Sequence, residues 1–395
     1  MANDLIARIK DSAHRLLPAV VEMRRDLHRY PELSFEEQRT SQQVQQFLDR
    51  QGISYSAGWG GHGVVATIKG GSEGPLTMLR ADMDALPITE INEVPYASTH
   101  PGIMHACGHD VHTSSLLGAA AILQEHRAFL TGEIRLVFQP GEEKLPGGAS
   151  LLIEEGLLKD QPKAMIGQHV HPPLQAGHVG FRGGLYMASA DEIYMTIIGK
   201  GGHAATPHLC IDPIVISARV ITALQELISR SIDPLSPAVL SFGKIFTDGG
   251  ATNVIPDRVH LEGTLRAMDE TWRMKTHVEL ARMVEHICLA SGATAEIKIM
   301  KGYPCLRNDP GLTIRCQEAA VHFLGEDKVH ELPQRMTSED FAFYSQQVPS
   351  CFYRLGTGWP EESRNFPVHT SRFDINEAAL ETGMGLMAFL GFTCR

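Results

Sequence analysis

Short apolar runs alternate with helical patterns in the first half of the chain. Four runs of strand length predict buried strands over residues 64–68, 76–79, 134–138 and 164–166. Hydrophobic positions recur with helical spacing over residues 40–48 and 112–123. Strands that alternate with helices form a largely parallel sheet covered on both faces. We therefore expect an α/β catalytic domain with a mostly parallel, mixed sheet flanked by helices.

The middle of the chain changes to a different order of elements. The pattern predicts a strand at 193–198, a helix at 212–228, strands at 239–245 and 259–265, a helix at 271–290 and a strand at 295–299. Asp212-Pro213 is a typical helix start. The order β-α-β-β-α-β is that of the ferredoxin-like α+β arrangement. We expect residues 187–301 to be an inserted domain between two parts of the catalytic domain, 1–186 and 302–395, with later helices at 312–323 and 376–389 and a strand at 351–355.

Length, composition and charge agree with a two-domain globular protein. The chain has 395 residues, of which 43% are apolar, and this exceeds the size at which one hydrophobic core keeps growing. Its 35 basic and 46 acidic residues leave a formal charge of −11, which disfavours nucleic acid and anionic membranes as partners. No stretch is apolar for long enough to span a bilayer, and seven scattered cysteines do not resemble a secreted disulfide framework. We expect a cytoplasmic protein.

Polar residues follow three of the predicted strands. Arg80-Ala81-Asp82 ends one strand, residues 139–143 follow another, and Gln168-His169 follows a third. Ligands of open α/β sheets bind at the carboxyl ends of the strands. These side chains are therefore predicted to lie at one edge of the sheet, where they can form a single site.

The tetrapeptide Cys107-Gly108-His109-Asp110 carries soft and hard metal ligands. Residues two apart do not face each other on a helix, so Cys107 and His109 should lie in a loop or turn from which both reach one ion. Cys107 has two alternative interpretations, as a thiolate nucleophile or as a buried structural cysteine. Glu142-Glu143 is the pair that a two-metal hydrolase needs, one carboxylate on a metal and a second to take a proton from water.

Several further residues have both a functional and a plainer interpretation. Asp82 and Asp110 are expected to accept the free ring N–H of a ligating histidine, although each could instead cap a helix or stabilise a turn. Of His169 and His171, only one is expected to reach the metals, and we choose His169 among the nineteen histidines of the chain. His203, in a glycine-rich turn, either lies in a flexible loop or presents its imidazole to an oxyanion.

Nine segments together carry a resemblance to a known family. They are residues 26–33 (DLHRYPEL), 80–87 (RADMDALP), 104–110 (MHACGHD), the Glu142-Glu143 pair, 169–172, 201–204 (GGHA), 253–256 (NVIP), 338–341 (SEDF) and His369. In these segments, and over nearly its whole length, the chain resembles the amidohydrolase branch of the dizinc aminoacylase and carboxypeptidase superfamily. That branch includes N-acyl-amino-acid amidohydrolases, hippurate hydrolases and auxin-conjugate hydrolases.

The resemblance implies a role for each matched residue. The implied metal ligands are Cys107, His109, Glu143, His169 and His369, and the implied general base is Glu142. The inserted domain resembles the lid and dimerisation domain of the family, which implies a homodimer or tetramer. His203 would reach the active site of the neighbouring subunit, while Asn253 and Arg266 would hold the substrate carboxylate. Where Gly141 stands the family more usually has alanine, so we expect a looser turn before the glutamates.

The expected activity is metal-dependent hydrolysis of the amide bond of N-acyl amino acids or related amino acid conjugates, which releases a carboxylic acid and a free amino acid. The expected partner is a small-molecule substrate, an N-acyl amino acid or a dipeptide. Two divalent cations are implied, zinc before manganese, cobalt or nickel, because the donor set combines thiolate, imidazole and carboxylate. Three alternatives are kept open: a peptidase or carboxypeptidase that acts on short peptides, an amidase with Cys107 as nucleophile, and a noncatalytic binding protein.

Overall fold

The structure is a computed structural model that describes residues 2–394, and these residues form two compact units. The first unit contains the described residues up to Tyr186, then Arg307–Pro333, and the chain from Asp340 onward. The second contains Met187–Leu306 and Gln334–Glu339. Met1 and Arg395, which the predicted domain bounds include, lie outside the described residues. The chain therefore returns to the second unit for six residues after leaving it.

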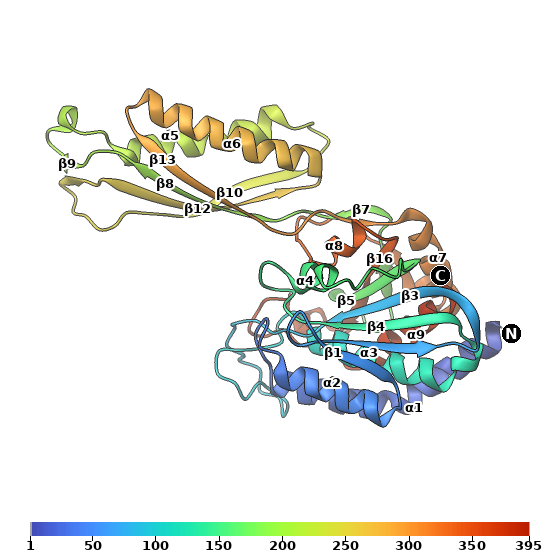
Figure 1. Ribbon diagram of the computed structural model, residues 1–395. Coiled ribbons are helices and arrows are strands. Elements are labelled where there is room, and N and C mark those ends of the chain that lie inside the picture. Colours follow the sequence, from blue (N-terminus) through green and yellow to red (C-terminus); the bar gives the residue numbers. More distant parts are fainter. Residues whose placement is uncertain (1, 395) are drawn as a thin grey trace. The chain divides into compact units, whose positions relative to one another are not determined.

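An eight-stranded sheet forms the centre of the first unit (Figure 1). In spatial order its strands are β1 (Ser54–Trp59), β2 (Gly63–Lys69), β4 (Thr131–Gln139), β3 (Ser72–Asp82), β5 (Ala164–Gln175), β16 (Ser350–Gly358), β6 (Val179–Phe181) and β15 (Val329–Glu331). The four central strands β4, β3, β5 and β16 run parallel, whereas β1, β2 and β4 pair in antiparallel fashion. The predicted mostly parallel, mixed sheet is confirmed.

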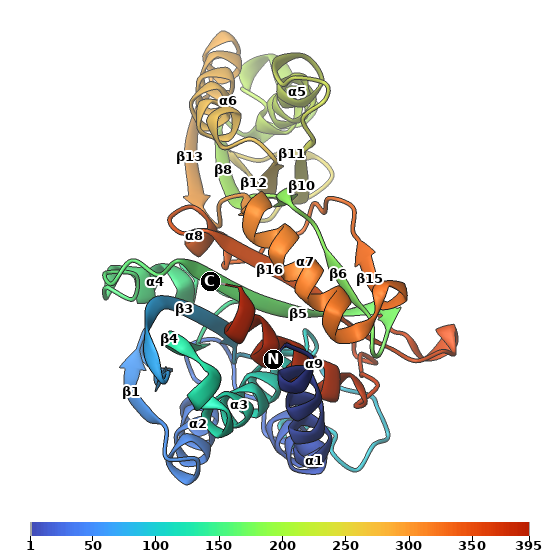
Figure 2. The same cartoon turned by 90° about the vertical axis from the view of Figure 1, so that its right-hand side faces the viewer.

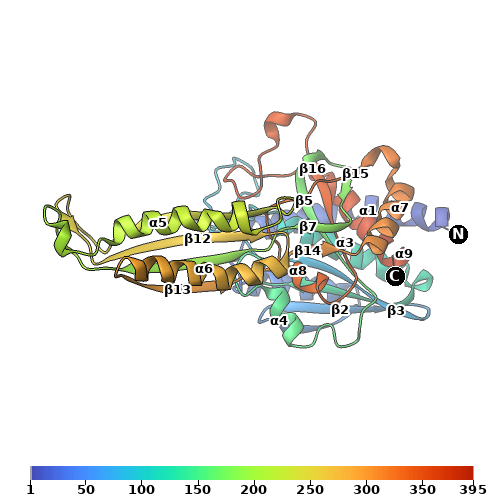
Figure 3. The same cartoon turned by 90° about the horizontal axis from the view of Figure 1, so that it is seen from above.

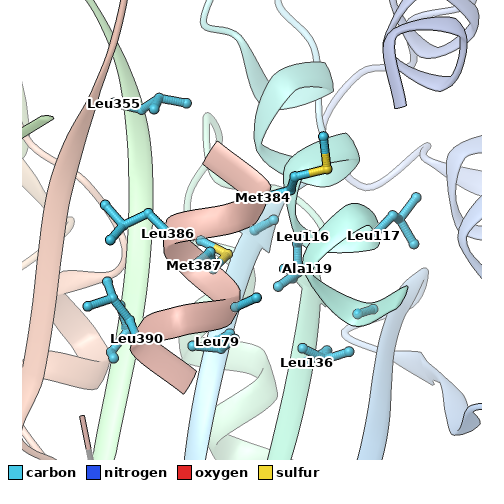
Figure 4. Packing of buried hydrophobic residues seen from close by; sticks show 14 of the residues in the cluster. Leu79, Leu116, Leu117, Ala119, Leu136, Leu355, Met384, Leu386, Met387 and Leu390 are labelled. Carbon is cyan, nitrogen blue, oxygen red and sulfur yellow. The ribbon is translucent and has the colours of Figure 1, made fainter. Parts of the chain in front are cut away.

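Helices pack on this sheet (Figures 1 and 2). They are α1 (Ala2–Arg29), α2 (Gln38–Arg50), α3 (His109–Glu125), α4 (Gly148–Glu154), α7 (Pro310–Leu324), α8 (Ala342–Ser345) and α9 (Ala379–Thr393). Every residue of α3 from His109 to Leu123 is buried because α3 packs against the sheet, against α9, which also lies on the sheet, and against α1. Figure 4 shows Leu116 of α3, Met387 of α9 and Leu79 of β3 in this contact.

The second unit has the predicted β-α-β-β-α-β order. Its elements are β8 (Asp191–Ile198), α5 (Pro213–Glu226), β10 (Ala238–Phe246), β12 (Arg258–Ala267), α6 (Glu270–Ala290) and β13 (Thr294–Lys301). The strands form an antiparallel sheet in the order β10-β12-β8-β13, and α5 and α6 lie side by side along it (Figure 3). Ile193, Met195 and Ile197 alternate with more exposed residues along β8, so one sheet face is buried beneath the helices. Asp212 caps α5, as its sequence predicted.

The remaining elements are short, and the hydrophobic pattern did not predict them. They are strands β7 (Gly184–Met187), β9 (Gly202–His203), β11 (Val254–Ile255) and β14 (Leu306–Asn308), and the single turns Arg127–Phe129, Pro207–Leu209, Leu227–Ser231, Glu326–Lys328 and Glu362–Arg364. Several predicted bounds differ from those of the structure. The last helix is Ala379–Thr393 rather than 376–389, the strand predicted at 76–79 begins at Ser72, and β5 continues past His169 to Gln175. Within residues 2–394, none of the helices has the length and hydrophobicity needed to cross a membrane.

Candidate metal centre

The structure brings the five predicted metal ligands and Glu142 into one cluster. Three sets of potential ligand atoms each lie within 4.8 Å of one another: Cys107 with His109 and His169, Cys107 with Glu143 and His369, and His109 with Glu142 and Glu143. Glu142 and Glu143 follow the end of β4, His169 lies in β5, and His109 is the first residue of α3. Strands β4 and β5 both pair with β3 in parallel, so the glutamates and His169 come from the same part of the sheet. Because the sets share members, they form one continuous site. In the described part of the chain, none of these sets includes His171.

His169 is held with one ring nitrogen directed at the cluster. Its Nδ1 donates to the Val170 carbonyl oxygen (2.9 Å), which places the lone pair on Nε2, 3.4 Å from Cys107 Sγ. Burial first, and then the positive charge of Arg354, lower the pKa of His169 well below its ordinary value. The ring is therefore neutral and can act as a metal ligand through Nε2.

His109 is oriented by a different carboxylate. Its Nδ1 donates to Asp84 Oδ1 (3.2 Å), and its buried Nε2 has no hydrogen-bond partner among residues 2–394. Burial lowers the pKa of His109, but the charges of Asp82 and Asp84 outweigh burial and raise that pKa to about 10. The pocket around His109 therefore carries an excess of negative charge that favours a cation.

Cys107 lies between two imidazoles and several carboxylates. Its Sγ is 3.4 Å from His169 Nε2 and 3.3 Å from His369 Nε2. Burial, and then the charges of Glu143 and Glu142, raise the pKa of the thiol well above its ordinary value. A cysteine nucleophile needs the opposite, a pKa lowered by neighbouring positive groups. The protein groups around Cys107 therefore disfavour the nucleophile interpretation.

The residues of the cluster fit divalent cations. Among residues 2–394, the buried His109 Nε2 has no hydrogen-bond partner, and Glu143 Oε1 forms no hydrogen bond although His369 Nε2 lies 3.2 Å away. Buried polar groups are otherwise almost always satisfied. The donor set combines a thiol, imidazoles and carboxylates, which are the ligands of zinc and related metals. A cation between these groups would satisfy both atoms and offset the excess negative charge.

Within residues 2–394, neither Asp82 nor Asp110 accepts a hydrogen bond from a ring nitrogen of a predicted metal ligand, although Asp82 Oδ2 lies 3.6 Å from His109 Nε2. Asp82 Oδ1 accepts from His112 Nδ1 (2.6 Å) and its Oδ2 pairs with Arg80 (2.7 Å), so Asp84 takes the predicted place beside His109. Asp110 accepts instead from two residues of α1. Gly108, rather than Asp110, occupies the N-cap of α3, so the capping alternative is also wrong.

The sequence interpretation missed Asp84 and His112. His112 donates to Asp82 and accepts through Nε2 from the Val170 backbone N–H (2.8 Å), which fixes the part of β5 that carries His169. His112 lies three residues after His109, so both rings lie on the same face of α3. The three-residue spacing from His109 could have indicated His112 from the sequence. The only comparable indication for Asp84 was its position two residues after Asp82.

The turn before the glutamates is tight rather than loose. Gly141 has φ +61°, and a Cβ there would lie 2.3 Å from Cε1 of the Phe35 ring. The Gly141 N–H donates to Glu37 Oε1 (2.7 Å). The Phe35 ring therefore occupies the space that an alanine methyl group would need, which corrects the expectation of a loosened turn.

The Gly141→Ala variant is expected to be less stable than the wild type. A methyl group would overlap the Phe35 ring, which costs about 1–3 kcal/mol, and the left-handed backbone adds about 1–2 kcal/mol. Urea unfolding measures the loss. The Phe35→Ala/Gly141→Ala double variant should lose less than the sum of the two single losses, because the overlap disappears. Equal stability of Gly141→Ala and wild type would contradict this packing.

Glu37 makes the unfolding free energy depend on pH. Burial, and then the charge of Asp84, raise its pKa from 4.5 to about 7. The folded protein therefore holds this proton more tightly than the unfolded chain. The resulting stability is complete below pH 4.5 and is lost as the pH rises through 7, about 3 kcal/mol in all.

The Glu37→Gln variant tests this dependence. An amide oxygen can still accept from the Gly141 and Phe35 N–H groups, but the side chain no longer titrates. In urea unfolding of metal-free protein, the stability of the variant relative to the wild type should increase by about 3 kcal/mol between pH 4.5 and pH 8. A relative stability that is independent of pH would show that Glu37 is already ionised at the lower pH.

The other three predicted site residues lie in the second unit, where His203 and Asn253 are close together and Arg266 is distant from both. His203 pairs with Val254 across β9 and β11, and the Ala204 N–H donates to the Asn253 carbonyl oxygen (2.9 Å), so His203 and Asn253 are exposed neighbours. Arg266 lies near the far end of β12, eight residues beyond Arg258. At about 3.3 Å per residue this separation is roughly 26 Å. Arg266 Nη1 donates to Ser338 Oγ (2.6 Å).

Comparisons with known proteins assign the family. Residues 78–390 match the sequence model of peptidase family M20/M25/M40. The N-acetyl-L-cysteine deacetylase of Bacillus subtilis is 43% identical over 91% of this chain and 84% of its own. The N-acyl-L-amino acid amidohydrolase of Geobacillus stearothermophilus is 44% identical over 74% of this chain and 79% of its own. A Bacillus subtilis structure described as a dinuclear metal-binding M20 peptidase is 35% identical, with a TM-score of 0.82 over 96% of this chain and 98% of its own. The chain belongs to peptidase family M20/M25/M40 and is a hydrolase of that family.

Proposed function

We propose that this protein hydrolyses the amide bond of N-acyl amino acids or related amino acid conjugates and releases a carboxylic acid and a free amino acid. The observation that carries the proposal is the single cluster formed by Cys107, His109, Glu143, His169 and His369 with Glu142 beside it. The relatives that act on N-acetylcysteine and N-acyl-amino acids support this substrate class. Action on dipeptides, as a peptidase or carboxypeptidase, is the second candidate, because the similar dinuclear structure is described as a peptidase.

The five clustered residues would hold two divalent cations. His169 Nε2 and His109 Nε2 both face the cluster while their Nδ1 atoms are engaged elsewhere. The Cys107 thiol favours zinc, and manganese, cobalt or nickel also suit the carboxylate and imidazoles. Bound there, two such cations would polarise the substrate carbonyl and lower the pKa of a water molecule toward 7.

Glu142 acts as the general base in this mechanism. Its side chain is 6% exposed, and Oε1 accepts from the Asp340 backbone N–H (3.3 Å), which limits its rotation. Glu142 takes a proton from the attacking water and delivers it to the amide nitrogen as the C–N bond breaks. A positioned acid-base group of this kind contributes roughly 10²- to 10⁴-fold to the rate.

The second unit would supply a residue to a neighbouring subunit in a homodimer or tetramer. His203 is exposed, and its Nδ1 accepts from the Ala205 N–H (3.1 Å), so the proton lies on Nε2. That outward N–H can donate to the oxyanion of the tetrahedral intermediate. Asn253, beside His203, would bind the carboxylate of the same substrate. Arg266 lies at the other end of the unit from His203. Arg266 and His203 of the same subunit would therefore serve two different active sites.

We also propose a reducing, cytoplasmic location. All seven cysteines are free in residues 2–394. Cys210 is partly buried and the other six are buried. Cys316, Cys351 and Cys394 lie in one core without forming a disulfide. Unpaired cysteines are typical of proteins that remain in a reducing compartment.

Metal removal combined with a substrate panel tests the proposed function. Protein stripped with EDTA should lose activity and recover it with zinc, manganese, cobalt or nickel. The panel should vary the acyl group and the amino acid separately and include dipeptides. Activity that survives complete metal removal but not iodoacetamide would point to a Cys107 nucleophile. No hydrolysis of any compound by metal-loaded protein would leave only a binding role.

A further inference from the structure

His369 has an unusual backbone conformation. Its φ is +63°, in the left-handed region, which costs a residue other than glycine about 1–3 kcal/mol and persists only where the surroundings enforce it. Its N–H donates to the Ala106 carbonyl oxygen (2.7 Å), directly before Cys107 in the chain. The backbone positions of two cluster residues are therefore tied together, and something must hold the loop after His369 in place.

Residues of the 90–96 loop hold part of this segment. The Ile91 N–H donates to the Ser371 carbonyl oxygen (3.0 Å), and the Tyr96 hydroxyl donates to Asp374 Oδ2 (2.8 Å). Both contacts fall within five residues of His369. The 90–96 loop is therefore hydrogen-bonded to the segment that follows His369.

Arg24 of α1 makes the remaining attachment. The guanidinium is completely buried, its Nε donates to Asp110 Oδ2 (2.8 Å), and its Nη2 donates to Asp374 Oδ1 (2.9 Å). Burial lowers the pKa of Arg24, but the charges of Asp110 and Asp374 outweigh burial and keep it charged. His28, one turn further along α1, also shares Asp110 Oδ2 (2.8 Å). The rigid guanidinium of Arg24 therefore joins Asp110, directly after His109, to Asp374, five residues after His369.

We propose that Arg24, Tyr96, Asp110 and Asp374, which we call the Arg24 clamp, are positioning residues that hold His369 against Cys107 and His109. None of the four side chains belongs to the clustered ligand sets. The clamp acts through the two chain segments that carry His109 and His369, and it enforces the left-handed backbone of His369. This inference rests on the proposed role of His369 as a metal ligand.

The Arg24→Lys variant tests the clamp, with Arg15→Lys as its control. Lysine keeps the positive charge but cannot reach Asp110 and Asp374 together. Arg15 lies on the same helix and also pairs with a carboxylate, Glu125 (2.7 Å), at the surface. Cobalt and zinc binding to the metal-free proteins is measured by competition with a chelating dye, together with the visible spectrum of the cobalt protein and hydrogen exchange over residues 366–378.

The expected result is specific to the clamp. Arg24→Lys should bind one of the two cations about 10- to 100-fold more weakly, with an altered cobalt spectrum and faster exchange after His369. Arg15→Lys should match the wild type. Tyr96→Phe, which removes one hydroxyl group, should also weaken cation binding, but by less than Arg24→Lys. If Arg24→Lys does not fold, the cation affinity of Tyr96→Phe tests the clamp instead.

Unchanged affinity and spectrum in a folded Arg24→Lys variant would overturn the proposal, even if exchange became faster, because Arg24 would then be purely structural. The same conclusion would follow from unchanged affinity in Tyr96→Phe if only that variant folds. A wild-type protein that binds fewer than two cations is a different failure. It would contradict the proposed function rather than the role of the clamp.

Discussion

The Glu142→Gln variant is expected to lose about 10²- to 10⁴-fold in kcat while it still binds both cations. Glutamine has nearly the same shape and can still accept from the Asp340 N–H, but it cannot take a proton from water. Steady-state kinetics on an N-acyl amino acid, with elemental analysis of the same sample, measure the two effects separately. Full turnover in this variant would remove Glu142 from the mechanism.

Glu143→Ala is the matched control, because it changes the adjacent carboxylate. Glu143 Oε1 lies 3.2 Å from His369 Nε2 and belongs to two of the ligand sets. Its loss should reduce metal content, and activity should fall with it. If Glu142→Gln lost metal as well, the two glutamates would share the ligand role and the base would have to be sought elsewhere.

Activity restored by mixing two inactive variants is the second large effect that we expect. His203→Ala should lower kcat by about 10²- to 10³-fold, as the loss of an oxyanion donor does. If the protein forms the proposed homodimer, one active site of a mixed dimer with Glu142→Gln would receive an intact Glu142 from one subunit and an intact His203 from the other. Random pairing makes half of the dimers mixed, with one complete site of two, so about a quarter of wild-type activity should return.

The experiment requires that the mixed dimers be isolated and counted. Two affinity tags, one on each variant, allow the mixed species to be purified and its activity measured directly. Mixed dimers with no more activity than either parent would show that His203 does not act across subunits. Activity in the His203→Ala homodimer close to that of the wild type would remove His203 from catalysis altogether.

Local pattern was enough to predict the sheet and the place of the cluster. Short apolar runs predict the strands that end at Asp82 and Gln139. Parallel strands place their carboxyl ends at one edge of the sheet, so the residues that follow them come together. The spacing of Cys107 and His109 requires a turn, and the structure has Gly108 at the helix start with φ +82°. These inferences succeed because they depend on neighbours in the chain.

Contacts between distant segments could not be inferred in this way. Which carboxylate meets the His109 ring depends on how β3 and α3 pack, and this decided in favour of Asp84 over Asp82. Asp110 contacts Arg24, 86 residues away in sequence, rather than a ligand. The short strand β9, which holds His203, exists only because β11 pairs with it.

The sequence by itself determined the α/β sheet, the β-α-β-β-α-β order of the second unit and the types of side chain available for a metal centre, because hydrophobic periodicity and turn residues act over short stretches of chain. Only the tertiary structure decided which ring nitrogens face the cluster, which carboxylates orient them and how Arg24 reaches the loop of His369. Hydrogen-bond direction and burial depend on the packing of segments far apart in sequence, and no local pattern records that packing.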